Sequence, residues 1–210
     1  MNLPRTRTMS LLSALGAGAA IGTLGALAGT FDGPVFHVVN LVFSAGWSWA
    51  CLAFLIGYTR PSKTESAWLA ASALAIGVTV YYLLKYLRPA APIGMTSDGM
   101  SGEGISSGIL AWGIAALLFG APMGLFGNLA RIPGIGGLAF RLLVPLIAYV
   151  ETSARLKVEA ATAGHFVEVT WSTIRVLAVL TAVALVAHTV WEWARSTRKP
   201  EGLKAGPDAD

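Results

Sequence analysis

The sequence predicts an all-α fold, a polytopic integral-membrane helical bundle with about six transmembrane helices. Three observations lead to this prediction. The chain has 210 residues, of which 55% are hydrophobic and 12% are charged, and this composition is too apolar for an ordinary soluble domain. The apolar residues form runs long enough to cross a bilayer core about 30 Å thick. The basic residues lie mainly in alternate loops between these runs, as the positive-inside rule describes.

A short basic head, residues 1–8, precedes the first apolar run, Met9–Gly29. Arg5 and Arg7 in the head also suit the charged region of a signal peptide. We favour a retained transmembrane helix, because the run is longer than the apolar region of a typical signal peptide. We therefore expect the first span to remain in the protein.

Glycines at four-residue spacing predict close helix crossings, since two backbones approach where side chains are small. We expect the glycines of the first span to face another helix. They are Gly18, Gly22, Gly25 and Gly29. The pair Gly120 and Gly124 repeats this spacing, and Pro122 between them predicts a kink.

Five further apolar runs follow the first. They are Val35–Tyr58, Ala67–Leu87, Ile105–Phe126, about Leu138–Ser153 and about Thr170–Trp193. We assign residues 9–196 to one six-helix transmembrane domain and residues 197–210 to a cytoplasmic tail that we expect to be disordered. No internal repeat is visible, which argues against an inverted-repeat transporter.

The loop charges predict the orientation. Six spans put both termini on one side of the membrane, and that side carries most of the basic residues. These are Arg5, Arg7, Arg60, Lys63, Arg131, Arg141, Arg195, Arg198, Lys199 and Lys204. The opposite side carries four basic and four acidic residues, namely Lys85, Arg88, Arg155, Lys157, Asp32, Asp98, Glu103 and Glu159. We therefore expect a multi-pass plasma-membrane protein with both termini in the cytoplasm.

Several function classes lack their sequence features. The net charge of +4 is spread over many loops, so it does not indicate nucleic-acid binding. Cys51 is the one cysteine, which leaves no intramolecular disulfide and no cysteine-based metal site. There is no P-loop, dinucleotide-binding glycine fingerprint, zinc-protease motif or nucleophile elbow, and no aspartate pair for magnesium diphosphate. We expect no cofactor and no metal.

Glu151 is the first candidate catalytic residue. It lies at the far end of the apolar stretch Leu142–Leu156, and an ionisable group at such a place is costly and therefore a functional candidate. In the alternative interpretation it lies at the headgroup level and pairs with Arg155, four residues on. Two more acids near the same membrane face, Asp32 and Glu168, complete the candidate catalytic set.

Polar and aromatic side chains gather at the extracytoplasmic ends of the expected spans, which predicts a cavity lined by helices. One run of such residues shares a helical face by its spacing of three and four: His37, Asn40, Ser44, Trp47 and Cys51. Interfacial anchoring explains part of the aromatic content whatever the function. The candidate substrate-binding residues are His37, Asn40, Trp47, Tyr81, Trp112, Tyr149, Trp171 and Arg175.

Carboxylates beside aromatic rings in an apolar bundle suit the proton-initiated cyclisation of a polyene. A carboxylic acid protonates an alkene or epoxide, aromatic faces stabilise the cation, a dry pocket excludes water and a base removes a proton. Burial favours the neutral acid but also weakens it as a donor, so a second group has to stabilise its carboxylate. We favour Glu151 as this acid, then Asp32. Glu168 suits the terminal base, since Arg155 or Arg175 would keep it ionised.

The chain resembles a group of small, mostly uncharacterised actinobacterial membrane proteins. The resemblance covers roughly Leu24–Leu156, through the segment Asn40–Trp49, the Tyr81-Tyr82 pair and the acid near the end of the fifth span. The general design is also similar to the small integral-membrane terpene cyclases of fungal meroterpenoid and bacterial drimentine-type pathways. That similarity implies carboxylates in a helical bundle that start cyclisation of a prenyl chain. It rests on size, span count and residue content, and it transfers no catalytic residue.

Three functions remain open at this stage. The first is a membrane enzyme for a lipophilic prenylated substrate, with class II terpene cyclisation as the expected reaction. The second is a small transporter or permease component in which Glu151, Asp32 and Arg175 line a path. The third is a structural membrane protein whose charges are interface residues. In the first case the expected partners are a lipophilic small molecule and the lipid bilayer.

Overall fold

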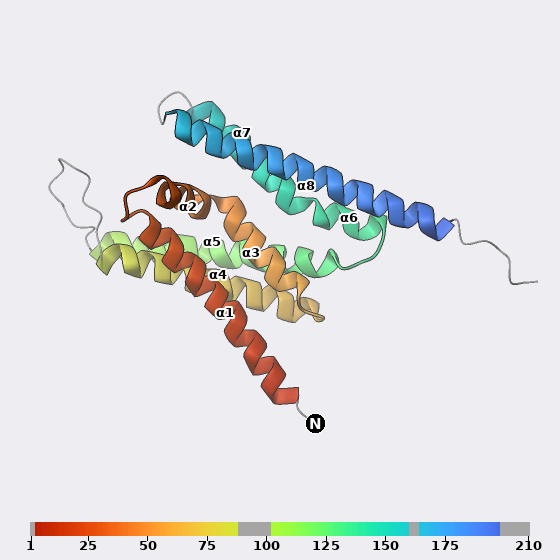
Figure 1. Cartoon of the computed structure of the whole chain (residues 1–210). Helices are drawn as coiled ribbons and strands as arrows, with labels where there is room; N and C mark the ends of the chain where they lie inside the picture. Colours follow the sequence, from red (N-terminus) through yellow and green to blue (C-terminus); the bar gives the residue numbers. More distant parts are fainter. Residues whose placement is uncertain (1–2, 88–101, 160–163, 198–210) are drawn as a thin grey trace, which may run out of the picture.

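A computed structural model of the chain describes residues 3–87, 102–159 and 164–197. These residues form eight α-helices and no strand (Figure 1), which confirms the predicted all-α fold. The helices are α1 (Leu3–Ala28), α2 (Pro34–Ser44), α3 (Gly46–Tyr58), α4 (Lys63–Leu87), α5 (Gly102–Leu129), α6 (Ile135–Arg141), α7 (Leu143–Glu159) and α8 (His165–Thr197).

The predicted head and tail of the chain differ in how far the helices extend into them. Helix α1 begins at Leu3, so residues 3–8 of the predicted basic head belong to the first helix. Helix α8 ends at Thr197, and residues 198–210 of the predicted tail lie outside the described residues. The loop that contains Asp98 also lies outside them.

Within the described ranges, five helical segments are long and apolar enough to cross a membrane. They are Leu11–Ala28, Lys63–Leu87, Ser107–Leu129, Ile135–Glu159 and His165–Arg195. The fourth of these joins α6 and α7. Helices α2 and α3 pass the same test only as a pair, and this pair supplies the sixth apolar segment. The protein is therefore a polytopic helical membrane protein.

The second predicted span is a broken helix. Helices α2 and α3 are bent by 67° where they meet, and Ala45 between them has an extended backbone with φ −85° and ψ 140°. The side-chain face expected from His37 to Cys51 assumed one continuous helix, and that assumption was wrong. The residues before and after Ala45 point in different directions because the helix axis changes there.

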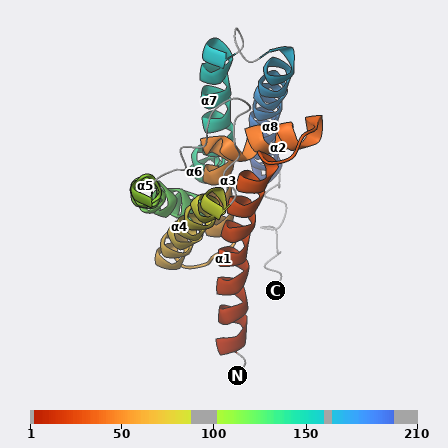
Figure 2. The same cartoon turned by 90° about the vertical axis from the view of Figure 1, so that its left-hand side faces the viewer.

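The helices form two groups (Figures 1 and 2). In the first group, α4 packs along α5, α1 packs on α4, and α3 packs on both α5 and α4. In the second group, α7 and α8 lie side by side, with the short helix α6 against both. Helix α7 also contacts α3, so α3 connects the α1–α5 bundle to the α7–α8 hairpin.

Glycines make the crossings inside the first group. A Cβ atom added at Gly18 would overlap the backbone of Ala73, and one added at Gly22 would overlap the backbone of Gly77, so α1 meets α4 at backbone distance. Gly124 of α5 meets the backbone of Ser66 in the same way. Gly25 and Gly29 also face other helices, at Phe43 and Tyr81 and at Asn40. The predicted close crossings are confirmed, although Gly25 and Gly29 contact side chains instead of backbone.

Arginines gather where α3 and α5 end. Arg131 and Asn128 both donate hydrogen bonds to the backbone carbonyl of Arg60, which follows α3. Arg141 donates to the carbonyls of Ala130 (2.8 Å) and Ile132 (3.0 Å), which follow α5. Cations at helix C-termini satisfy carbonyls that have no intrahelical partner. This basic end lies at the opposite end of α3 from the cavity described next.

Candidate functional site

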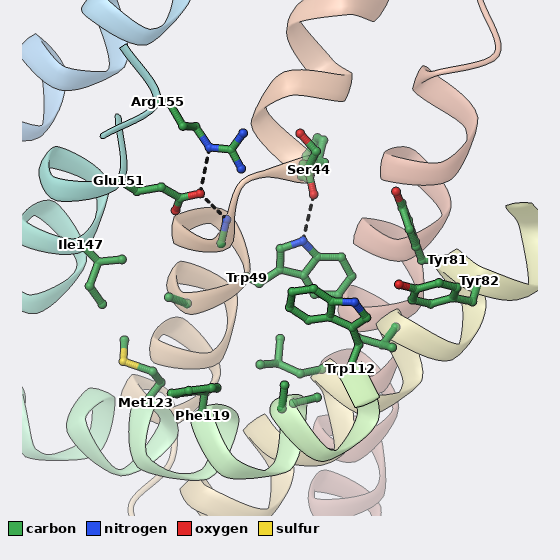
Figure 3. A pocket seen from close by; sticks show the side chains of 17 residues that line it. Ser44, Trp49, Tyr81, Tyr82, Trp112, Phe119, Met123, Ile147, Glu151 and Arg155 are labelled. Carbon is green, nitrogen blue, oxygen red and sulfur yellow. Dashed lines mark hydrogen bonds and ion pairs between the residues drawn. The ribbon is translucent and has the colours of Figure 1, made fainter. Parts of the chain in front are cut away.

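A cavity of about 610 Å³ lies between the α1–α5 bundle and α7 (Figure 3). Its size is within the range of about 300–1,000 Å³ that is typical of small-molecule pockets. Five helices contribute to its lining. The residues are Phe43, Ser44, Gly46, Trp49, Ala50, Leu74, Val78, Tyr81, Tyr82, Trp112, Ala115, Ala116, Phe119, Met123, Ile147, Glu151 and Arg155.

The walls combine aromatic and aliphatic side chains, and the aromatic ones are the largest. Helix α5 supplies Trp112 and Phe119, and α4 supplies Tyr81 and Tyr82, whose rings meet edge to face with centroids 5.5 Å apart. The indole of Trp49 is fixed in place because its N–H donates to the carbonyl of Phe43 at 2.8 Å. Ring faces of this kind accommodate a hydrocarbon chain and attract a cation.

Glu151 forms the polar end of the cavity together with Arg155 (Figure 3). Its two carboxylate oxygens accept hydrogen bonds from the first backbone N–H groups of α3, those of Gly46 (2.9 Å) and Trp47 (2.7 Å). Arg155 donates from Nε to the same carboxylate at 3.1 Å. The carboxylate therefore caps a helix N-terminus, where backbone N–H groups lack an intrahelical acceptor.

The break between α2 and α3 makes this contact possible. The extended backbone of Ala45 ends α2 and turns the N–H groups of the next two residues toward α7. Gly46 has no side chain, and this allows the carboxylate to approach closely. A Cβ atom added at this position would lie only 3.3 Å from Oε2 of Glu151. The broken helix, the glycine and the acid therefore form one local arrangement.

The charged contacts continue from Glu151 to α8. Arg155 donates from Nη1 to Glu159 at 3.0 Å, and the indole of Trp171 on α8 donates to the other oxygen of Glu159 at 2.9 Å. The guanidinium group of Arg155 also lies 5.0 Å from the ring centroid of Trp171, which is fully buried. This chain of contacts ties α3, α7 and α8 together behind the cavity.

The three groups that contact Glu151 are all hydrogen-bond donors, two backbone N–H groups and a guanidinium group, so both carboxyl oxygens act as acceptors. A carboxylate held in this way can stabilise a positive charge in the cavity. A role as proton donor would require the contacts with α3 to loosen.

Three of the residues predicted from sequence line the cavity, namely Glu151, Tyr81 and Trp112. Trp47 and Trp171 lie instead in a second cluster, with Ala45 and Val167, that α8 forms with the residues around the α2–α3 break. In this cluster the indole N–H of Trp47 is buried and has no hydrogen-bond partner among the described residues.

The other predicted residues lie outside the lining. Asp32 is exposed in the turn between α1 and α2, and Glu168 is exposed near the start of α8, 3.7 Å from His165. His37 contacts the ring of Phe166 at 5.5 Å. The remaining three are Asn40, which packs near Gly29, Tyr149, which is half exposed on α7, and Arg175, which is partly buried on α8.

Sequence reasoning missed several residues of the lining. On α5 they share one helical face with Trp112, at spacings of three, four, seven and eleven: Ala115, Ala116, Phe119 and Met123. This periodicity was present in the sequence and would have identified the wall. Trp49 was missed in favour of Trp47, because Trp47 was grouped with His37 and Asn40 by a spacing that does not continue across the break at Ala45. Both tryptophans lie on α3, two residues apart, so they point to different sides of that helix.

The fold and the site together define a class, a polytopic helical membrane protein with an aromatic cavity and a carboxylate–guanidinium pair at one end. No group of three or more histidines, cysteines or acids that could hold a metal occurs in the described part of the chain. Comparison with known proteins adds no identity, since no family model, curated protein or solved structure matches the chain.

Proposed function

We propose that this chain is an integral-membrane protein that binds a lipophilic, prenylated molecule in the cavity between α5 and α7. The observation that carries the proposal is the lining, which combines aromatic and aliphatic walls with one polar end formed by Glu151 and Arg155. Such a pocket fits a hydrocarbon chain along its walls and a hydrogen-bonding head at its polar end. Most of the lining away from this end is aromatic or aliphatic, which favours the binding of an apolar molecule over the passage of a polar solute.

The reaction that we propose for the bound molecule is proton-initiated cyclisation of its prenyl chain, as in the terpene cyclases whose general design the chain resembles. In that reaction a proton adds to an alkene or epoxide, the cation moves along the chain as rings close, and loss of a proton leaves an alkene. Trp49, Trp112 and Tyr82 present the aromatic faces that stabilise such a cation. The apolar walls exclude the water that would quench it.

Within this reaction, Glu151 is best suited to the last step. Its oxygens accept from α3 and Arg155 at the polar end of the cavity, and a carboxylate placed there can take up the proton released by the final cation. If Glu151 also delivers the first proton, its protonation has to be coupled to a loosening of the α3 contact. Asp32 and Glu168 remain candidate acids, and both would need a rearrangement to reach the cavity.

A structural role for Glu151 is the second candidate, and a specific observation favours it. The carboxylate already holds the N-terminus of α3 and pairs with Arg155, so these contacts alone account for an acid at this position. In this case the residue joins two helices and takes no part in chemistry.

The orientation that we propose has both termini in the cytoplasm. The arginine-rich end at Arg60, Arg131 and Arg141 then faces the cytoplasm, and the polar end of the cavity lies toward the outer half of the membrane. A reporter that works only in the cytoplasm should be active when it is fused to the C-terminus, and a reporter that works only outside the cell should be inactive there. A C-terminal reporter that is active outside the cell would refute this orientation.

The cyclisation proposal is tested by expressing the chain together with a prenyltransferase that supplies prenylated substrates, followed by product analysis. The wild type should form a cyclised product, and Glu151→Gln should lose it. Asp32→Asn and Glu168→Gln test the other two acids, and Trp112→Ala should release partly cyclised products. If all three acid variants make the normal amount of product, the acid–base mechanism is wrong. If only Glu151→Gln fails to make product and this variant is also unfolded, the structural role of Glu151 is sufficient to explain the loss of product.

A further inference from the structure

Two large side chains of the cavity wall are also exposed on the outside of the helix bundle. Trp112 and Phe119 line the cavity, yet 57% and 70% of their surfaces are accessible. Leu74 and Met123 line the same cavity and are almost fully buried. The cavity is therefore closed at its inner side and open along the outer face of α5.

Helix α7 forms the opposite edge of this opening, through Ile147, Glu151 and Arg155 (Figure 3). It packs on α8 and on α3, and not along α5, so the two edges of the opening belong to helices that do not close on each other. Both helices lie in segments apolar enough to cross a membrane. With both segments placed across a bilayer, an opening between them faces lipid chains.

We propose that the cavity is a lateral pocket that takes a long-chain prenyl lipid directly from the bilayer. The polar head lies against Glu151 and Arg155, and the far end of the chain passes between α5 and α7 and stays among the lipid tails. This inference rests on the proposed function and narrows its substrate class to prenyl lipids whose chain is longer than the cavity. An open pocket accepts such chains, because the protruding part remains in an apolar medium at no cost. A closed pocket excludes them by volume.

A chain-length series tests the opening. The full chain is purified in detergent micelles and mixed with equal concentrations of farnesol, geranylgeraniol and the much longer solanesol, and native mass spectrometry identifies each bound prenol by its mass. We expect one prenol per protein, with solanesol occupancy within about threefold of that of farnesol. If farnesol binds and solanesol is excluded, the pocket is closed and the lateral opening is wrong, while the proposed function stands. If no prenol binds, the proposed function fails together with this inference.

Variants of α5 show whether the bound prenol occupies the cavity. Ala115 lines it, whereas the adjacent Ile114 is 49% exposed and lies outside the lining. Ala115→Phe should lower the occupancy of all three prenols about tenfold by filling the space, and Ile114→Phe should leave it unchanged. Equal losses in both variants would place the prenols on the outer surface of α5 and overturn the pocket.

A second pair of variants tests the rim. Phe119 and Leu118 are both strongly exposed on α5, and only Phe119 lines the cavity. Phe119→Ala should weaken solanesol binding about fivefold through lost contact with the protruding chain, and Leu118→Ala should not. If Phe119→Ala leaves solanesol binding unchanged, the chain does not leave the cavity by this opening.

Discussion

The α1–α5 bundle and the α7–α8 hairpin are held by different kinds of contact. Inside the bundle, glycines bring backbones together, as where Gly22 meets Gly77 and Gly124 meets Ser66. The hairpin is joined to the bundle through the hydrogen bonds of Glu151 and a small cluster around the buried Trp171. Backbone crossings leave no room between helices. The hydrogen bonds of Glu151 to α3 and Arg155, which we call the polar joint, instead hold the surfaces of α3 and α7 apart at one end. The cavity lies where the second kind of contact begins.

The largest expected effect comes from filling a backbone crossing. Gly22→Leu and Gly124→Leu should each destabilise the protein by about 3 kcal/mol or more, because the helices have to separate to admit the side chain. Thermal unfolding in detergent and the yield of folded protein report this change. Gly16→Leu and Gly113→Leu are matched controls, since nothing lies within 4 Å of either position. A similar loss in controls and crossing variants would contradict the glycine-mediated packing.

The next largest effect is expected at the polar joint. Glu151→Gln replaces one acceptor oxygen by an amide N–H₂ group that cannot accept from α3, and it removes the ion pair with Arg155. We expect a loss of about 2–3 kcal/mol, measured by thermal unfolding. Glu168→Gln, at an exposed acid whose partner is 3.7 Å away, should change stability by less than about 0.5 kcal/mol. Equal stability of both variants would show that Glu151 is not a structural contact.

Trp171 should contribute less than Glu151. Trp171→Phe removes the indole hydrogen bond to Glu159 and part of a fully buried side chain. The expected loss is about 1–2 kcal/mol. Trp68→Phe is the matched control, because Trp68 is exposed on α4 and should tolerate the change. If the two variants unfold at the same temperature, the cluster around Trp171 does not hold the hairpin.

The smallest effect is expected at the helix break. Gly46→Ala brings a Cβ atom to 3.3 Å from a Glu151 oxygen, so the carboxylate has to shift by a few tenths of an ångström. We expect a loss of about 1 kcal/mol at the joint. Gly113→Ala, which meets no neighbour, should instead be neutral or stabilising by about 0.5 kcal/mol, since alanine favours a helix. A stabilising Gly46→Ala would mean that the carboxylate does not approach the backbone this closely.

Composition and periodicity were sufficient to predict the parts of the fold that depend on local sequence. The apolar runs identified the membrane segments, and the spacing of Gly18 and Gly22 identified a close crossing. Both signals follow from one helix at a time. The partner of that crossing, α4, was not predictable, because a glycine indicates proximity and not which helix comes near.

The candidate site was predictable only in part. Glu151 was selected because placing an acid in an apolar stretch costs free energy, and the structure places it at the cavity. Its ligands on α3 were not predictable, because they are backbone N–H groups exposed by a break at Ala45 that has no proline to mark it. The same break interrupts the helical spacing that grouped Trp47 with His37, so the wrong tryptophan was chosen for the cavity wall.

The central claim, that the cavity at the polar joint binds a prenyl lipid, is tested most directly by photo-crosslinking. Farnesol that carries a diazirine near its far end is irradiated with the protein in bilayer nanodiscs, and the labelled peptides are mapped with and without excess unlabelled farnesol. We predict labelling at Phe119 and Met123 of α5 and at Ile147 of α7, suppressed by the competitor. Labelling spread along the exposed face of α8, at Val176, Leu180 and Val183, and insensitive to the competitor would contradict the claim.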